Sequence, residues 1–102
     1  MIRVVAVITA KPGRREDILA LFRANMPAVH AEAGCIEYAP FVDAEGFAPL
    51  QTAYGADTFV VLETWASAEA LKDHGASPHM ATYGKAVREM IAERKIYILG
   101  AA

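Results

Sequence analysis

Three segments of this chain carry apolar side chains on both faces of the strands that they would form. The opposed sets are Ile2, Val4 and Ile8 against Val5 and Val7; Val60 and Leu62 against Phe59 and Val61; and Ile96 and Ile98 against Tyr97 and Leu99. A sheet covered on one side alternates apolar and polar residues. A chain of 102 residues is too short to cover both faces of a sheet. We therefore expect helices on one face and a second copy of the chain on the other, in a two-fold homodimer.

The spacing of apolar residues predicts a long helix after the first of these strands. Residues 2–10 form the strand, and Lys11-Pro12-Gly13 form the turn that closes it. Apolar residues then recur every three or four positions from about residue 14 to residue 33, at Ile18, Phe22, Met26 and Val29. Pro27 lacks an N–H and clashes with the carbonyl of Arg23, so we expect a kink or a break between these two residues.

The remaining elements complete a β-α-β-β-α-β order. Further strands are predicted at residues 35–42, with Pro40 at an edge or a bulge, at 58–66 and at 96–99. Ser67 caps a short helix that ends near Gly75, and Ser77-Pro78 begin another. Residues 43–57 form a long loop of the kind that contacts ligands or partners. This order predicts an α+β, ferredoxin-like fold with an antiparallel sheet and helices on one face, in one domain spanning residues 1–102.

Composition limits the ligands and partners of the chain. Ten basic and twelve acidic residues give a net charge of −2 without a run of either sign, so nothing indicates a nucleic-acid partner. The single cysteine, Cys35, excludes an internal disulfide and favours a reducing cytoplasm. The apolar start is too short to cross a membrane. A domain of this size leaves little room for a flavin or dinucleotide, and the spacing of His30, His74 and His79 does not suit a metal site, so we expect no cofactor.

Reactive side chains are densest between residues 63 and 83. His74 lies at the end of the first short helix, where the helix dipole favours the imidazolium, and His79 lies in the first turn of the next, where it favours the neutral ring. A neutral His79 could accept a proton near pH 7. Each residue also has a structural explanation, because helix-terminal histidines are common on surfaces and residues such as Trp65 and Tyr83 commonly pack in cores.

Five motifs extend over nearly the whole chain. They are Lys11-Pro12-Gly13, Glu32-Ala33-Gly34-Cys35, Tyr38-Ala39-Pro40-x-Val42-Asp43, Glu63-x-Trp65 and His74-x-x-Ser77-Pro78-His79-Met80. Together they resemble the antibiotic biosynthesis monooxygenase family, and most closely its quinol monooxygenase branch. The resemblance implies a ferredoxin-like subunit, a homodimer whose two sheets face each other, and a cavity between sheet and helices. It also implies oxygenation of a quinol or phenolic ring without flavin, haem or metal.

The leading hypothesis is a cofactor-independent monooxygenase that oxidises a small quinol or phenolic aromatic with O2. His74 and His79 are the candidate catalytic bases, since a deprotonated quinol can pass an electron to O2 directly. The residues expected to contact the aromatic ring are Trp65, Tyr83 and, further away, Tyr38 and Phe41.

Two alternatives stay open, and a third is not expected. The isomerase that processes phosphorylated autoinducer-2 shares the His-x-x-Ser/Thr-Pro-His segment, which keeps an oxygen-independent reaction possible. A non-catalytic dimer that binds a small ligand is the second alternative. Haem-degrading relatives use an Asn in the first strand and a His on the last helix; here the first strand has no Asn and Gly84 lies near the helical position.

Overall fold

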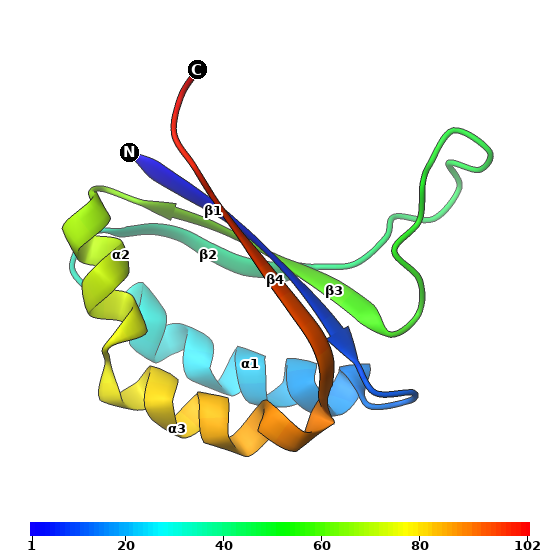
Figure 1. Ribbon diagram of the computed structural model, residues 1–102, viewed down its shortest axis with the longest axis horizontal. Coiled ribbons are helices and arrows are strands. Elements are labelled where there is room, and N and C mark those ends of the chain that lie inside the picture. Colours follow the sequence, from blue (N-terminus) through cyan, green and yellow to red (C-terminus); the bar gives the residue numbers. More distant parts are fainter.

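The chain forms a four-stranded antiparallel sheet around the Val- and Ile-rich segment at its start. The computed structural model describes all of residues 1–102. The strands are β1 (Ile2–Ala10), β2 (Cys35–Phe41), β3 (Thr58–Trp65) and β4 (Ile91–Leu99), in the spatial order β2-β3-β1-β4. The two central strands are therefore β1 and β3, with β2 and β4 at the edges (Figure 1). This arrangement confirms the predicted ferredoxin-like α+β fold.

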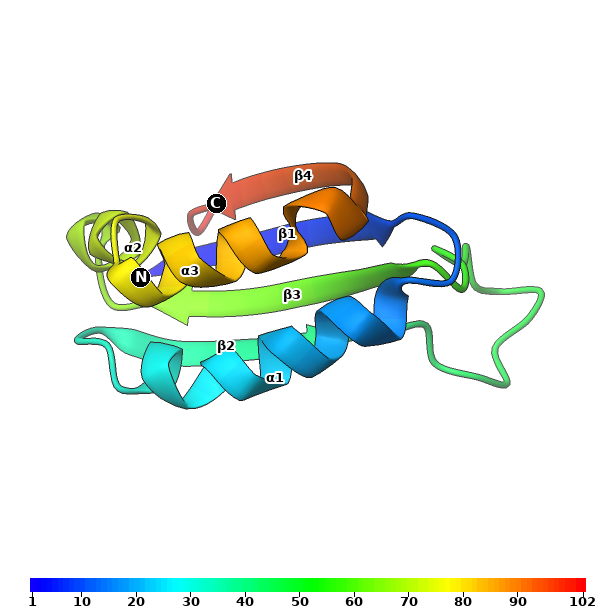
Figure 2. The same ribbon diagram turned by 90° about the horizontal axis from the view of Figure 1, so that it is seen from below.

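Three α-helices lie on one face of this sheet (Figure 2). They are α1 (Arg15–His30), α2 (Ala68–Gly75) and α3 (Pro78–Val87), and a single 3₁₀ turn (Arg88–Met90) joins α3 to β4. Helix α1 packs directly on β2 and against α3, whereas α3 stands off from the strands. No helix is both long and apolar enough to cross a bilayer.

Aromatic side chains fill the layer between α1 and the sheet. Phe22 of α1 stacks on Tyr38 of β2 with ring centroids 4.9 Å apart and an angle of 14° between the rings. Its edges meet Phe59 and Tyr83, each with a centroid distance of 6.0 Å. Such offset and edge-to-face pairs are the favoured aromatic geometries. Trp65, at the end of β3, has no exposed surface.

The strand register shows that both faces of the sheet are apolar. On the helix side, Val4, Ala6 and Ile8 are buried and lie opposite Glu63, Val61 and Phe59. On the other side, Val5 and Val7 lie opposite Leu62 and Val60, flanked by Phe41, Tyr97 and Leu99 from the edge strands. We call these seven residues the open sheet face. Phe41, Tyr97 and Leu99 are each nearly half exposed, so this chain alone does not cover its second apolar face.

Most element boundaries agree with the sequence pattern, because short-range chemistry fixes them. Ser67 accepts a hydrogen bond from the N–H of Ala70, as expected of a helix cap. Ser77 differs, because its hydroxyl donates to the carbonyl oxygen of His74 at 2.7 Å and does not cap α3. Pro40 lies in the edge strand β2, as predicted.

Two predicted boundaries are wrong. Helix α1 is not broken at Pro27 but continues to His30: the proline removes one hydrogen bond, to the carbonyl of Arg23, while the following turn still closes, with the N–H of Ala31 donating to the carbonyl of Pro27 at 3.1 Å. Strand β4 begins at Ile91 rather than at residue 96. Its first part pairs only with β1 and is exposed, so residues 91–95 show no apolar alternation that would mark a strand.

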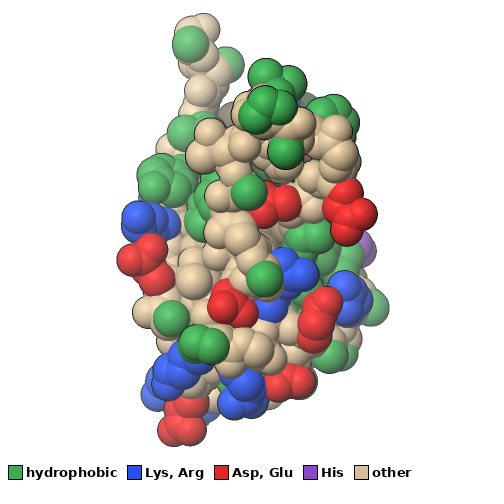
Figure 3. All heavy atoms as spheres, turned by 90° about the vertical axis from the view of Figure 1, so that its right-hand side faces the viewer, with side chains coloured by type: hydrophobic (Ala, Val, Ile, Leu, Met, Phe, Trp, Pro, Cys, Tyr) green, Lys and Arg blue, Asp and Glu red, His purple; other side chains and the backbone are tan.

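The loop between β2 and β3 projects from one end of the molecule (Figure 1). Asp43 closes it by accepting hydrogen bonds from the N–H groups of Tyr54 and Gly55 at 3.0 and 2.8 Å, and these bonds lower the pKa of Asp43. Phe47 and Leu50 are exposed in the loop. Figure 3 looks onto this end, where basic and acidic side chains are interspersed and form no patch of one sign.

Candidate functional site

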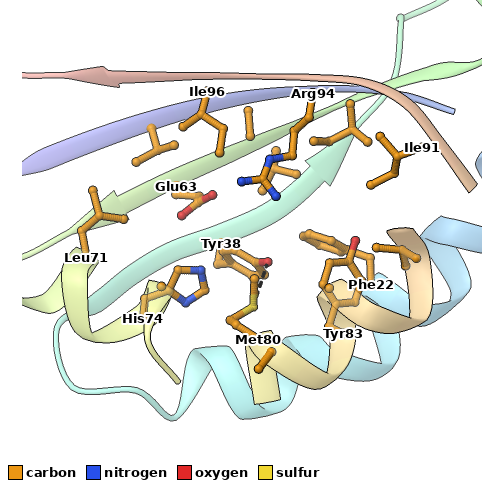
Figure 4. Close-up of a pocket in the computed structure, with 18 of the residues that line it drawn as sticks. Phe22, Tyr38, Glu63, Leu71, His74, Met80, Tyr83, Ile91, Arg94 and Ile96 are labelled. Atoms are coloured by element: carbon orange, nitrogen blue, oxygen red, sulfur yellow. Dashed lines mark hydrogen bonds between the residues drawn. The ribbon is translucent and has the colours of Figure 1, made fainter. Parts of the chain in front are cut away.

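A cavity of about 760 Å³ lies between the sheet and helices α2 and α3 (Figure 4). Fourteen of its 21 lining residues are hydrophobic, and its size is within the range of small-molecule sites. Ile96 and Ile98 of the edge strand β4 line it while remaining 47% and 61% exposed. The cavity therefore opens beside β4.

Small residues on α2 and α3 leave this space empty. Gly75, Ala81 and Gly84 line the cavity, and a Cβ atom added at Gly84 would have no neighbour within 4 Å. Larger side chains at these positions would fill the volume between α3 and the sheet. These small residues thus leave α3 separated from the strands, with no packed layer of side chains between the helix and the sheet.

Glu32, in the turn after α1, joins helices α2 and α3 through His74 and His79. Its carboxylate is 12% exposed, and Oε2 lies 2.9 Å from Nδ1 of His74 and 2.7 Å from Nε2 of His79. Gly34, two residues on, has a φ of +83° and no room for a Cβ, which would lie 2.6 Å from Cβ of Ala70. This close approach lets the turn after α1 pack against α2 and brings Glu32 to the two histidines.

The carboxylate fixes the tautomer of His74. A carboxylate only accepts hydrogen bonds, so Nδ1 of His74 must carry a proton. In the neutral ring the lone pair is then on Nε2, which makes no hydrogen bond within the chain. His74 lines the cavity (Figure 4). A hydrogen-bonded acid, an oriented imidazole and a free ring nitrogen form the arrangement of a general base.

His79 has a different position. Its Nε2 donates a hydrogen bond to Glu32 and is 3.2 Å from the Ser77 hydroxyl, so that nitrogen already has its partners within the protein and is not free for a ligand. The ring lines a separate, shallower hollow of about 320 Å³ on the α1 side of α3. His30 lies apart, with Nε2 2.8 Å from the carbonyl oxygen of Tyr38. No group of three or more His, Cys, Asp or Glu side chains is arranged to hold a metal ion.

Glu63 is the one acidic side chain that lines the cavity. It lies on β3 facing the helices and is 8% exposed, and Oε1 accepts a hydrogen bond from Nε1 of Trp65 at 2.9 Å. Burial raises the pKa of Glu63, and the bond from Trp65 and the charge of His74 offset part of that rise. Glu63 is therefore a carboxyl group that takes up a proton more readily than usual.

Two tyrosines contribute neutral hydroxyl groups to the cavity wall. Burial raises the pKa of Tyr38 far above its usual value and raises the pKa of Tyr83 to about 12. The Tyr38 hydroxyl points at the sulfur of Met80, 4.0 Å away. Both tyrosines therefore stay protonated at neutral pH, and they can pack against a ring or donate a hydrogen bond but not act as bases.

The structure brings together only some of the residues singled out from the sequence. His74, Tyr38 and Tyr83 line the cavity. Trp65 packs behind His74, with ring centroids 4.6 Å apart, and does not line it. Phe41 lies on the open sheet face, because a residue three positions from Tyr38 in a strand points the opposite way.

Four residues of the site were not among the candidate catalytic or substrate-binding residues, although three of them lie in the motifs: Glu32, Glu63, Met80 and Arg94. Glu63 had a usable signal, since it is a charged residue in phase with the apolar Phe59 and Val61 on β3. Arg94 had no such signal, because the sequence predicted that its strand begins at residue 96 and so left Arg94 outside the sheet.

Comparisons with known proteins agree with this geometry. The profile of the antibiotic biosynthesis monooxygenase family matches residues 1–86. A protein of Escherichia coli K12 named "probable quinol monooxygenase YgiN" is 37% identical over 101 residues, covering 97% of this chain and 96% of its own. Two solved structures are each 26% identical: PA3566 from Pseudomonas aeruginosa, with a TM-score of 0.81 over 99% of this chain and 93% of its own, and Rv0793 from Mycobacterium tuberculosis, with a TM-score of 0.80 over 99% and 94%. Fold, cavity and sequence thus point the same way, and the chain belongs to the antibiotic biosynthesis monooxygenase family.

Proposed function

We propose that this protein is a monooxygenase that oxidises a small quinol or related phenolic ring with O2, with His74 as the catalytic base. The observation that carries the proposal is the Glu32–His74 pair at the end of a mostly apolar cavity. The printed name of the Escherichia coli relative supports the same class of substrate. His79 is the weaker candidate for the base because its Nε2 is already bonded to Glu32.

The first step is removal of a proton from a quinol hydroxyl. Nε2 of His74 accepts that proton, and the carboxylate of Glu32, 2.9 Å from Nδ1, stabilises the imidazolium that forms. The ring of the substrate lies among apolar and aromatic side chains, including Tyr38 and Tyr83, which exclude water from the reacting atoms.

The substrate itself supplies the electrons. The quinolate gives an electron to O2, a carbon–oxygen bond forms on the ring, and the O–O bond then breaks. The quinol loses four electrons in all, two on becoming a quinone and two on gaining a hydroxyl group, and O2 takes up those four. One oxygen atom remains in the hydroxyquinone and the other leaves as water. Glu63, with its raised pKa, is placed to supply a proton to the departing oxygen.

Oxygen uptake tests the role of His74. With reduced 1,4-naphthoquinone as substrate, the wild type should consume O2 well above the autoxidation rate. His74→Ala should lose this excess, because it removes the proposed base, whereas His79→Ala should keep most of it. Unchanged rates in both variants would remove the histidines from the mechanism.

We further propose that the working unit is a homodimer in which two open sheet faces pack together. Val5, Val7, Val60 and Leu62 form a continuous apolar surface at the centre of that face, and half-exposed aromatic and aliphatic side chains border it. Surfaces of this kind mark protein interfaces. Sedimentation at micromolar concentration should show a dimer, and a stable monomer would contradict this assembly.

An oxygen-independent isomerase is the second candidate. His74 and Glu63 both line the cavity and could pass a proton from one atom of a small metabolite to another. Turnover in a strictly anaerobic chamber would favour this reaction over oxygenation.

A further inference from the structure

We propose that the substrate of this site carries a carboxylate in addition to its phenolic hydroxyl, and that Arg94 is the residue that binds it. The inference rests on the proposed function and deepens it, because it names the second polar group that the substrate must have. It comes from an arginine side chain that extends into a largely apolar cavity without an acidic partner.

The position of Arg94 in β4 directs its side chain into the cavity. It lies opposite Ile8 in the strand register, on the face of the sheet that the helices cover. Figure 4 shows its guanidinium group extending from β4 toward the space above Tyr38 and Tyr83. The neighbouring Lys95 points to the other face and pairs with Glu93 at 3.5 Å.

No group in the chain neutralises Arg94. It makes no hydrogen bond to another side chain or to the backbone, and no carboxylate oxygen lies within 4.0 Å of its guanidinium nitrogens. Its charge acts on Tyr83, whose pKa it lowers against the larger effect of burial. Arg94 is exposed to solvent beside the opening of the cavity, and its unpaired guanidinium keeps its hydrogen-bond donors free for an anion that enters there.

The charges around the cavity reinforce this preference. Lys85 and Arg88 also line it and are likewise free of ion pairs, so three cationic side chains face one carboxyl group, Glu63. Glu63 is a poor counter-ion, since its burial favours the protonated form. The lining is therefore positive overall.

The type of cation indicates the type of anion. A guanidinium group is planar and donates two parallel hydrogen bonds, which match the two oxygens of one carboxylate. His74 extends from α2 and Arg94 from β4, on opposite walls (Figure 4). A flat aromatic molecule with a hydroxyl at one end and a carboxylate at the other presents one polar group to each of these walls.

Ligand binding without turnover tests the proposal. The probes are 6-hydroxy-2-naphthoate and 2-naphthol, which share a ring system and a hydroxyl group and differ in the carboxylate. Titration calorimetry at pH 7 should show that the wild type binds the acid about 10- to 100-fold more tightly than the naphthol. Arg94→Gln should lose most of that difference while keeping its affinity for 2-naphthol.

Lys95→Gln is the matched control, since it removes a cation from the adjacent position on the opposite face. It should bind both probes like the wild type. Circular dichroism and the melting temperature confirm that each variant is folded. The proposal is overturned if the wild type fails to bind the acid or binds both probes equally; equal binding is the result expected if the Arg94 side chain pairs with Glu63 instead of the ligand. It is also overturned if Arg94→Gln keeps the preference for the acid. Because no oxygen chemistry is involved, these outcomes are independent of the oxygen-uptake result.

Discussion

Glu32 is the residue that orients the ring of His74 and fixes its tautomer, so Glu32→Gln is the sharpest single change to make at this site. The variant keeps the size and shape of the side chain. It replaces two accepting oxygens by one accepting oxygen and one donating NH2 group. Nδ1 of His74 lies 2.9 Å from Oε2 and 3.2 Å from Oε1, and Nε2 of His79 lies 2.7 Å from Oε2, so in either orientation the amide NH2 group faces the N–H of His74 and a hydrogen bond of that ring is lost.

The magnitude follows from that loss. A hydrogen bond to a charged group contributes about 1.5–3 kcal/mol, and the carboxylate is only 12% exposed, so Glu32→Gln should lower the free energy of unfolding by about that amount. For a domain of this size the melting temperature should fall by roughly 4–8 °C per kcal/mol. If the amide NH2 faces His74, the ring moves its proton to Nε2 and loses its basic nitrogen. Loss of the carboxylate that orients a catalytic histidine can reduce the turnover number by up to about 10⁴-fold.

Steady-state oxygen uptake and thermal unfolding measure the two effects separately. The turnover number should fall while KM changes little, because Glu32 does not line the cavity. Glu45→Gln is the matched control, since Glu45 is exposed in the projecting loop, and the change should shift stability by less than about 0.5 kcal/mol. A Glu32→Gln variant that keeps both the wild-type turnover number and its pH profile would refute the argument that Glu32 orients the base.

Three further changes test other parts of the structure. Gly84→Ala should raise the free energy of unfolding by about 0.5–1 kcal/mol, because a helical glycine there has open space for a Cβ, whereas Gly84→Leu should stay folded but lose binding of 2-naphthol in titration calorimetry. The pKa of Glu63 is raised by folding, so its contribution to stability is full below the ordinary value and is lost as the pH rises through the folded pKa. The free energy of unfolding of the wild type, measured in urea, should therefore fall as the pH rises above about 4.5. In Glu63→Gln, whose amide oxygen can still accept from Trp65, it should change less over the same range. Leu62→Lys should shift sedimentation from dimer to monomer, since it places a charge at the centre of the open sheet face.

The sequence predicted those parts of the fold that depend on local chemistry. The apolar residues on both faces of β1 and β3 predicted both strands and the two apolar faces of the sheet. Ser67 marked the start of α2 because a hydroxyl can accept from the N–H groups of the first turn. The start of β4 could not be found in this way, because residues 91–95 belong to the sheet only through their pairing with β1.

The site was less predictable because it joins distant segments. Glu32 lies 42 residues from His74 and 47 from His79, and their contact depends on how the turn at Gly34 packs against α2. His74 and His79 were both candidates in sequence, where the helix dipole favoured the neutral ring for His79; only the structure separates the ring that faces the cavity, that of His74, from the one that faces away.

Isotope labelling tests the central claim most directly, namely that the protein inserts an oxygen atom from O2 into a quinol. Reduced 1,4-naphthoquinone would be turned over under 18O2 by the wild type and by His74→Ala, with a protein-free sample as the measure of autoxidation. Mass spectrometry should find one 18O atom in the hydroxyquinone made by the wild type and only the autoxidation level with His74→Ala. A product without 18O, or one formed at the same rate in the absence of O2, would contradict the account.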